Sequence, residues 1–561
     1  MTSPLFADPA LEAFLRVTDE LIAPGGLFEV AKENVLEQAM LVFRKRSRSL
    51  REILVRADTH GDRDCFVFSD GRRITFTEIP RQVASVAAYL RDERNIGRGD
   101  RVAICAANGA GWLLTMWALA SLGAVNVAMN GWWTELEMRH ALDLTEPKLL
   151  LADAKRSARL GATPGLGRLD IDADLDVMLA HDPAAELPAD PIDEDDPAML
   201  VFTSGTTGRP KAAVLTHRVI IAFSMEQMFI GMRMAALGTA PAPVGPVVRL
   251  AVFPLFHISG LSAPVSSVLG GTTTVWPLGR FDAGEVIELT VQERINVWSG
   301  TATHILRLLD HPDVSRVDPR QLLQVSMGGS ATTPHIVRRS DERFPHLRGT
   351  LSSGYGSTET GGLVSFAPNW MLAAAPDCVG PPLPTVEVRI TDEDGTVLPE
   401  DREGHICVRS PLVMPGYWRH DEANAEVFDA DRWYRTGDFG RMEGGLLFIA
   451  SRLRDLIIRG GENIYPFEIE NRLEEHPDVL EVAVFGVDHD ELGQEVKAVV
   501  VVMPGAVLTV ADVREHCAVA LSSYKIPSHV ELRTDPLPRN ATGKVMKQVL
   551  SGEGENTFIE E

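Results

Sequence analysis

Cysteine is scarce in this sequence, with five residues among 561. The five lie far apart and show neither the short spacing of a metal-binding motif nor the even framework of a disulfide-stapled domain. They are Cys65, Cys105, Cys378, Cys407 and Cys517. This distribution is typical of a reducing compartment, so we expect a cytoplasmic protein without structural disulfides.

Basic residues are also in deficit. The chain has 54 lysines and arginines against 78 aspartates and glutamates, a formal net charge of −24 at pH 7. Nucleic acids and anionic lipids are bound by predominantly positive surfaces, so this balance argues against a general affinity for either. It leaves small phosphorylated ligands open, because a few backbone N–H groups, a lysine and a metal ion suffice to bind them.

The sequence lacks an uninterrupted membrane span. The first twenty residues carry acids where a signal peptide needs basic residues and then an apolar core. Two uncharged runs, 102–134 and 250–279, are long enough to cross a bilayer, but glycine, asparagine or proline interrupts both. We interpret them as buried strand and helix segments of a parallel sheet and expect no integral span. A peripheral membrane contact stays open.

What the sequence does contain is a long alternation of short apolar runs with helical stretches, in a chain too long for one core. Two such series fill the first two-thirds and predict an α/β architecture with two parallel-sheet subdomains. Short alternating strands separated by Gly, Pro and Asp turns follow at about 380–450, which predicts a small antiparallel β subdomain. We expect an N-terminal domain at 1–452 and a small α+β domain at 453–561.

The clearest motif, TSGTTGRPK at 203–211, comes directly after an apolar strand. Its glycines allow a tight turn that points N–H groups at phosphate, and its hydroxyls donate further hydrogen bonds. It is not a Walker A loop, because Arg209 and Pro210 separate Gly208 from Lys211. The alternative is an ordinary solvated surface loop. Nine fitting residues directly after a buried strand make this alternative a poor explanation.

Five more motifs follow along the chain: MGGSA at 327–331, YGSTE at 355–359, YRTGD at 434–438, SRLRDLIIRGGENIYPFEIE at 451–470 and PRNATGK at 538–544. Together with the glycine-rich loop they resemble, in order and over nearly the whole chain, the adenylate-forming superfamily. That superfamily comprises acyl-CoA synthetases, luciferases and peptide-synthetase adenylation domains, and the resemblance is strongest to the acyl-CoA synthetase group.

The resemblance implies a two-step reaction. ATP first activates a carboxylic acid as an acyl-adenylate, and the acyl group then passes to coenzyme A, leaving AMP and pyrophosphate. In the first step a carboxylate attacks the α-phosphate, so one anion approaches another and charge must be neutralised, which a lysine and Mg²⁺ do well. ATP, Mg²⁺ and coenzyme A are therefore the expected small molecules, with a mobile C-terminal domain.

The motifs assign roles to individual residues. Lys544 is the expected catalytic lysine, and Glu359 the expected Mg²⁺ ligand, with Thr203 assisting. Asp438 can accept two hydrogen bonds from the ribose diol, although Thr-Gly-Asp is also ordinary turn chemistry. The full expected nucleotide-binding set is Thr203, Ser204, Gly205, Thr206, Thr207, Gly208, Lys211, Gly329, Ser330, Gly354, Tyr355, Gly356, Thr358, Asp438 and Arg452.

The second half-reaction requires a different arrangement of the domains. By resemblance, the C-terminal domain rotates about Arg454, and Gly460 and Gly461 then line the channel of the pantetheine arm, where side chains would obstruct it. The family usually has Asp or Lys at the hinge and Gly before the preceding arginine. Arg454 and Ser451 depart from this pattern, which questions the ease of rotation rather than the chemistry.

Other residues keep two interpretations. His257 matches a position that borders the acyl carboxylate, which we favour slightly over a satisfied core histidine. Trp132 and Trp133 fit either a pocket wall or core packing. The basic cluster formed by Arg44, Lys45, Arg46, Arg48 and Arg51 fits the phosphates of coenzyme A, but a solvated helix face is the simpler interpretation.

The identity of the acid is not encoded in any motif. Apolar residues near the expected acyl site, such as Phe223, Met225 and Phe256, favour a medium- or long-chain fatty acid or another apolar acid. Three rivals remain: an adenylating enzyme that loads a separate carrier protein, an oxygenase of luciferase type, and an inactive scaffold. A homodimer is compatible with the sequence and is not indicated by it.

Overall fold

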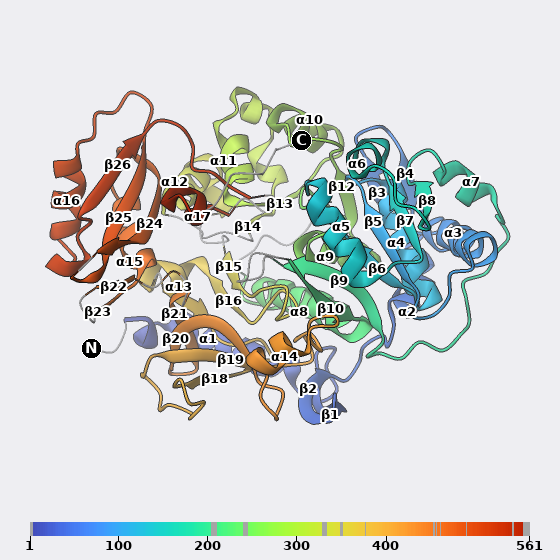
Figure 1. Ribbon diagram of the computed structural model, residues 1–561, viewed down its shortest axis with the longest axis horizontal. Coiled ribbons are helices and arrows are strands. Elements are labelled where there is room, and N and C mark those ends of the chain that lie inside the picture. Colours follow the sequence, from blue (N-terminus) through green and yellow to red (C-terminus); the bar gives the residue numbers. More distant parts are fainter. Residues whose placement is uncertain are drawn as a thin grey trace.

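The structure is a computed structural model that describes residues 4–203, 210–238, 245–327, 334–347, 352–375, 377–452, 455, 457–459, 462–489, 491–540 and 544–553. The N-terminal part opens with α1 (Pro9–Ile22) and a hairpin of β1 (Val30–Val35) and β2 (Gln38–Phe43), then α2 (Leu50–Val55). Two large sheets, a smaller antiparallel sheet and a C-terminal sheet follow (Figure 1).

The first large sheet has the strand order β10-β9-β6-β5-β7-β8 and is parallel except for β10. Its strands are β5 (Arg101–Cys105), β6 (Val125–Ala128), β7 (Leu149–Ala152), β8 (Gly167–Asp170), β9 (Pro197–Thr203) and β10 (Lys211–Thr216). The connecting helices are α3 (Ile79–Arg94), α4 (Ala110–Leu122), α5 (Glu135–Thr145), α6 (Ala154–Leu160) and α7 (Leu175–Ala180).

The second large sheet has the order β14-β13-β11-β12-β3-β4, and only the edge pair of β3 and β4 is antiparallel. Its strands are β3 (Asp64–Phe68), β4 (Arg73–Thr75), β11 (Val248–Leu250), β12 (Thr273–Trp276), β13 (Val297–Gly300) and β14 (Gln324–Met327). Its helices are α8 (His217–Ala236), α9 (Ile258–Gly270), α10 (Ala283–Gln292), α11 (Ala302–Asp310) and α12 (Pro334–Arg343). The two predicted parallel sheets are thus confirmed.

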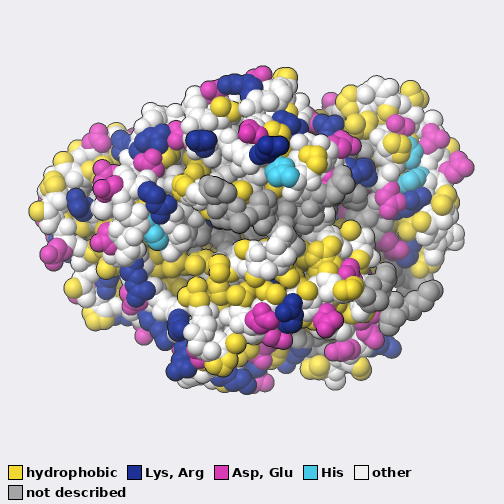
Figure 2. Space-filling view, turned by 180° about the vertical axis from the view of Figure 1, so that it is seen from behind, with side chains coloured by type: hydrophobic (Ala, Val, Ile, Leu, Met, Phe, Trp, Pro, Cys, Tyr) yellow, Lys and Arg dark blue, Asp and Glu magenta, His cyan; other side chains and the backbone are white. Residues whose placement is uncertain are grey.

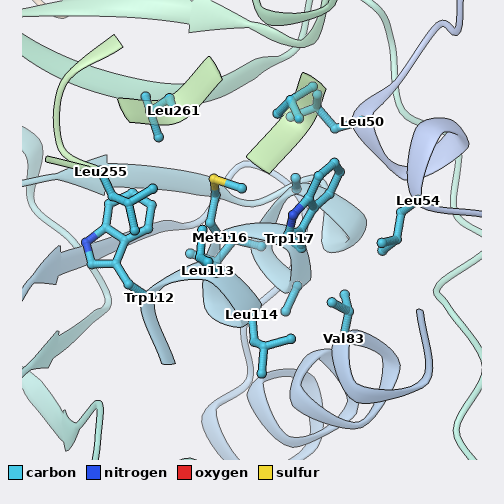
Figure 3. Close-up of a cluster of buried hydrophobic side chains, with 14 of the residues drawn as sticks. Leu50, Leu54, Val83, Trp112, Leu113, Leu114, Met116, Trp117, Leu255 and Leu261 are labelled. Carbon is cyan, nitrogen blue, oxygen red and sulfur yellow. The ribbon is translucent and has the colours of Figure 1, made fainter. Parts of the chain in front are cut away.

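The apolar run at 102–134 forms β5, α4 and β6, and every residue of α4 is buried. Side chains of α4 meet side chains of α2, α3 and α9 in one large core (Figure 3). The labelled members of this cluster are Leu50, Leu54, Val83, Trp112, Leu113, Leu114, Met116, Trp117, Leu255 and Leu261. Among the described helices, α8 alone has the length and apolar composition of a membrane span, and most of that stretch is buried in the protein.

A five-stranded antiparallel sheet follows, with the order β17-β21-β20-β19-β18, and confirms the predicted β subdomain. Its strands are β17 (Cys378–Gly380), β18 (Glu387–Thr391), β19 (Gly404–Arg409), β20 (Tyr434–Glu443) and β21 (Leu446–Arg452). Before it lie the hairpin β15 (Ser352–Tyr355) and β16 (Ser365–Pro368) and the helix α13 (Asn369–Ala374), and α14 (Asp421–Val427) is inserted before β20.

The C-terminal part forms its own mixed sheet at the left end of the view in Figure 1. It contains β22 (Ile457–Arg459), β23 (Glu462–Ile464), β24 (Val479–His489), β25 (Gly493–Val502) and β26 (His529–Arg533), with α15 (Pro466–Glu474), α16 (Val510–Ala518) and α17 (Lys547–Ser551). Its apolar core is separate from those of the N-terminal part. The expected domain boundary lies between residues 452 and 453, and residue 453 lies outside the described residues.

The basic cluster at 44–51 is neither on one helix nor uniformly solvated. The side chain of Arg46 is 3% exposed and donates to both Glu33 and Glu194, with 2.9 Å between Arg46 Nη2 and Glu194 Oε2. Burial lowers the pKa of the Arg46 guanidinium, but the hydrogen bonds that it donates to these carboxylates outweigh this effect and raise it. Both sequence-based interpretations are therefore wrong for Arg46, which anchors the β1–β2 hairpin through a partner 148 positions away.

The outer surface shows no dominant charge of one sign in the rear view (Figure 2). Lysine and arginine side chains are interspersed there with aspartate and glutamate.

Candidate active site

The glycine-rich loop connects two paired strands. Thr203 is the last residue of β9 and Lys211 the first of β10, and these two residues are opposite each other in the antiparallel ladder. Lys211 is buried, with 9% of its surface exposed. The loop therefore leaves and re-enters the sheet at one point. Ser204, Gly205, Thr206, Thr207 and Gly208, which carry the phosphate-binding prediction, lie outside the described residues.

Tyr417 links this sheet to the YGSTE motif. The segment 416–418 runs beside β10, with hydrogen bonds from Val214 N to Gly416 O and from Trp418 N to Ala212 O. The ammonium of Lys211 lies 5.2 Å from the centroid of the Tyr417 ring. The Tyr417 hydroxyl donates to Glu359 Oε1 at 3.1 Å. Lys211 and Glu359 therefore both approach Tyr417, Lys211 at the ring and Glu359 at the hydroxyl.

A second phenol extends this arrangement. The hydroxyl of Tyr434, the first residue of the YRTGD motif, is hydrogen-bonded to that of Tyr417. Burial raises the pKa of both phenols, and the neighbouring carboxylate of Glu359 raises them further, so both stay protonated donors near neutral pH. Glu359 is half-buried, and its second carboxylate oxygen accepts no hydrogen bond from the described residues. Such an oxygen suits a hard divalent cation.

The two motifs expected around adenine and ribose also meet. The hydroxyl of Tyr355, at the end of β15, donates to Asp438 Oδ2 at 2.7 Å, and Asp438 is 9% exposed on β20. Across the ladder, Asp438 is paired with Arg452 of β21. Gly354 is exposed, whereas Gly356 is tightly packed: a Cβ at Gly356 would lie 2.4 Å from the carbonyl oxygen of Gly362. Thr358 is half-buried in the turn that follows.

His257 and Lys544 approach each other although 287 positions separate them. His257 precedes α9 as its N-terminal flanking residue, and its Nε2 is buried without a hydrogen-bond partner among the described residues. Burial lowers the pKa of His257 to about 3, and the positive charge of Lys544 lowers it as well. A satisfied core histidine is therefore the wrong description. The C-terminal part places its lysine close enough to act on the N-terminal part electrostatically.

Lys544 lies on a short hairpin that is attached to β24 at one end and to α15 at the other. Hydrogen bonds join Asn540 N to Lys544 O at 2.9 Å and Lys544 N to Asn540 Oδ1 at 3.0 Å. On one side of the hairpin Arg539 forms an ion pair with Glu481 at 2.9 Å; on the other, Lys547 pairs with Glu470 at 2.8 Å. Buried Leu537 packs beneath the hairpin, and Val545 and Leu550 pack against the same cluster.

Five other predicted residues lie outside the described residues: Gly329, Ser330, Arg454, Gly460 and Gly461. The sequence, in turn, gave no indication of Tyr417 or of the ion pairs made by Arg539 and Lys547. The GYW run at 416–418 is a weak signal by itself. Only the pairing of that segment with β10 shows that its tyrosine reaches Glu359.

These features define a class of protein. A glycine-rich loop at a sheet edge, a carboxylate oriented by phenols, a buried aspartate beside a tyrosine, and a lysine supplied by a separate C-terminal sheet are the parts of a nucleotide-dependent acid-activating enzyme. Residues 54–418 match the AMP-binding enzyme family and residues 468–544 match the AMP-binding enzyme C-terminal domain. The chain belongs to this adenylate-forming family.

Relatives narrow the activity. The chain is 32% identical to a feruloyl-CoA synthase of Amycolatopsis sp over 479 residues, which cover 85% of this chain and 93% of the relative. It is 30% identical to the mitochondrial medium-chain acyl-CoA ligase ACSF2 of Danio rerio over 540 residues, covering 88% and 86%. ATP-bound MatB from Rhodopseudomonas palustris superimposes with a TM-score of 0.77 at 29% identity, covering 90% and 98%. The protein is an AMP-forming acid–CoA ligase.

Proposed function

We propose that this enzyme activates an acid with a largely apolar skeleton, and that Lys544 and His257 flank the reacting carboxylate. The observation that carries the proposal is the approach of Lys544 to His257 across the two parts of the chain. In the activation step the substrate carboxylate attacks the α-phosphorus of ATP and pyrophosphate leaves. The ammonium of Lys544 offsets the negative charge that accumulates on the carboxylate and phosphate oxygens.

In this proposal Glu359 holds the Mg²⁺ ion that accompanies ATP, with Thr203 assisting. The metal would neutralise phosphate charge, and the carboxylate of Glu359 is the kind of oxygen ligand that would hold it. The hydrogen bond from Tyr417 fixes the rotamer of Glu359 and leaves its other oxygen for the cation. Asp438, oriented by Tyr355, binds the ribose hydroxyls, and Arg452 lies opposite it in the ladder.

For thioester formation the C-terminal part rotates about Arg454 and withdraws Lys544, so that Gly460 and Gly461 border the path of coenzyme A. The thiolate of coenzyme A attacks the acyl carbonyl and AMP leaves. His257, uncharged at any physiological pH because of its lowered pKa, is suited to receive a hydrogen bond at the acyl site and cannot add a second positive charge there.

Apolar side chains on α8 and beside His257 support an apolar acid. Phe223, Met225 and Met228 lie on α8, Phe256 precedes His257, and the ring of Trp132 packs edge-on against that of Phe256 at 4.9 Å. The printed names of the relatives cover an aromatic acid and a medium-chain fatty acid. Fatty acids of medium or long chain and aromatic or polycyclic acids are accordingly the proposed substrates, with a cytoplasmic location.

A substrate panel tests this function. The purified enzyme, with ATP and Mg²⁺, is offered straight-chain acids, aromatic acids and polar amino acids, and AMP release is measured with and without coenzyme A. We expect AMP and acyl-CoA with an apolar acid only when coenzyme A is present. AMP release that needs a carrier protein, or oxygen consumption with the adenylate, would replace the proposal by one of its rivals; no pyrophosphate exchange with any acid would indicate an inactive scaffold.

A further inference from the structure

Asn108 joins the two large sheets beside His257. It lies between β5 of the first sheet and α4, and its side chain reaches the segment that follows β11 of the second sheet. Asn108 Nδ2 donates to Phe253 O at 2.9 Å, and Asn108 Oδ1 accepts from Leu255 N at 2.9 Å. One amide group therefore binds two alternate backbone positions of a distant segment, as a neighbouring strand would.

The residues on both sides of this bridge are anchored. On the side of Asn108, the buried carboxylate of Asp153 accepts from Ala107 N at 2.9 Å and forms an ion pair with Arg156. On the other side, the side chain of Leu255 is fully buried in the large core around α4 (Figure 3). The amide of Asn108 therefore connects two segments that have little freedom of their own.

The bridged segment carries His257. His257 N donates to Pro254 O at 3.1 Å, which closes a tight turn, and His257 O accepts from Gly260 N at 3.0 Å. The turn packs closely onto α9, because a Cβ at Gly260 would lie 2.0 Å from Pro254 O. His257 is thus two residues beyond Leu255, in a turn that includes Leu255 itself. Fixing Leu255 through Asn108 therefore also fixes the point from which the imidazole extends.

An equivalent amide bridge lies at the opposite end of β11, away from His257. Asn296 Oδ1 accepts from Val248 N at 2.9 Å, and Asn296 Nδ2 donates to Pro246 O at 3.0 Å. Asn296 is half-buried, as Asn108 is. The segment that Asn296 binds contains no candidate site residue, so this bridge shows what the interaction contributes to stability alone.

The position of the imidazole matters in the proposed function, where His257 borders the reacting carboxylate. Burial lowers the pKa of His257 to about 3, so the ring is uncharged and its position cannot depend on an ion pair. The location of the ring is therefore set mainly by the backbone that carries it. Near reacting atoms such placement is critical, because a displacement of about 1 Å can cost roughly 10²-fold in rate.

We propose that Asn108 is a positioning residue for acid activation: its amide fixes the turn at 254–257 and thereby holds the imidazole of His257 against the reacting carboxylate. This inference rests on the proposed function. Asn108 acts only through the backbone that it binds. Because β5 and β9 are parallel strands of one sheet, Asn108 and Thr203 both lie at its carboxyl edge. This edge then has two tasks, phosphate binding and alignment of the acyl side.

The test uses matched substitutions at the two asparagines of the full-length enzyme. Asn108→Leu and Asn296→Leu each remove both hydrogen bonds with little change in side-chain size. Asn108→Asp and Asn296→Asp keep the acceptor and lose the amide donor, and they replace the leucine pair if either leucine variant fails to fold. His257→Ala and the double variant of Asn108→Leu with His257→Ala complete a double-mutant cycle. Tm and pyrophosphate exchange are measured with the straight-chain or aromatic acid that the wild type uses fastest.

We expect Asn108→Leu to lower kcat for pyrophosphate exchange about 10- to 100-fold, because the imidazole is displaced. The KM for ATP should stay constant, because the nucleotide-binding residues are not displaced. Asn296→Leu should lower Tm by a similar amount, since it also leaves backbone groups without partners, but its kcat should be unchanged. In the double variant, Asn108→Leu should cause no loss beyond that of His257→Ala, because Asn108 acts through that imidazole.

Three results would overturn the inference: a normal kcat in Asn108→Leu, an equal loss of kcat in Asn296→Leu, or losses that multiply in the double variant. A slow His257→Ala beside a normal Asn108→Leu would exclude the inference alone and leave the proposed function intact. A normal rate in His257→Ala would instead exclude the role of His257 in the proposed function, and the inference with it.

Discussion

The N-terminal and C-terminal parts hold their candidate site residues in different ways. Glu359 and Asp438 are half-buried or buried, and each receives a tyrosine hydroxyl from a distant element. Lys544 is exposed on a hairpin that ion pairs of Arg539 and Lys547 connect to Glu481 and Glu470 of its own lobe. In the proposed function this difference has a purpose, since one part holds a nucleotide in place and the other carries a charge that can be withdrawn. Variants in the two parts should therefore affect the two half-reactions differently.

The largest effect is expected at Lys544, the charge that the proposed function withdraws after adenylation. Lys544→Ala should lower acyl-adenylate formation about 10²- to 10³-fold, since it removes a cation placed where transition-state charge develops. Thioester formation from a supplied acyl-adenylate should be spared, because the lysine is then withdrawn. Pyrophosphate exchange and a thioester assay measure the two steps. Lys497→Ala, which removes an ammonium paired with Glu531 in the same lobe, is the control. Equal loss of both steps would refute the assigned role.

A buried carboxyl group in the N-terminal part should affect stability and leave the ratio of the two half-reactions unchanged. Glu226 on α8 is fully buried and accepts from Thr385 N and Oγ1, and burial raises its pKa from 4.5 to about 7. The folded state binds this proton more tightly than the unfolded state does. The stability that this difference contributes is therefore fully present below about pH 4.5 and is lost as the pH rises through 7. Over that window the loss is about 3 kcal/mol. Glu226→Gln should restore this free energy of unfolding at pH 8 and leave the free energy of unfolding unchanged at pH 4.

Urea unfolding at the two pH values measures this difference, and the exposed substitution Glu515→Gln is its control. The half-reactions should keep their ratio, unlike in Lys544→Ala. A Glu226→Gln variant that is no more stable than wild type at pH 8 would contradict the raised pKa.

Local patterns and contacts between distant segments also differ in how well the sequence predicts them. The alternation of apolar runs and helices predicted both parallel sheets, and the motifs indicated Glu359, Asp438 and Lys544 as candidate site residues. Contacts between distant segments could not be predicted from the sequence. Tyr417 is hydrogen-bonded to Glu359, 58 positions away, and Arg46 to Glu194, 148 positions away. The edge strands β3 and β4 join a sheet whose other strands come more than 170 positions later. Neither periodicity nor a local motif records such partners.

The ion pairs of the hairpin should have a smaller effect than the lysine they flank. Lys547→Glu places two like charges together at Glu470, and we expect adenylation to fall about tenfold as Lys544 loses its fixed position. The reversed pair, Lys547→Glu with Glu470→Lys, should recover most of the rate. Thioester formation from supplied acyl-adenylate should be unchanged in both. Lys497→Glu, beside Glu531 in the same sheet, is the matched control. A single variant with normal pyrophosphate exchange, or a double variant without recovery, would exclude a positioning role.

The smallest effect is expected where the N-terminal part orients its own carboxylate. Tyr417→Phe removes one hydrogen bond to Glu359 but keeps the ring beside Lys211, so adenylation should fall about five- to tenfold. If the phenol serves to orient a metal ligand, the Mg²⁺ concentration for half-maximal rate should rise while the KM for the acid stays constant. Tyr89→Phe, whose hydroxyl accepts from Arg94 far from the site, should alter neither quantity. An unchanged Mg²⁺ dependence in Tyr417→Phe would mean that Glu359 is oriented by the backbone, through its carbonyl bond to Met414 N at 2.9 Å, and not by the phenol.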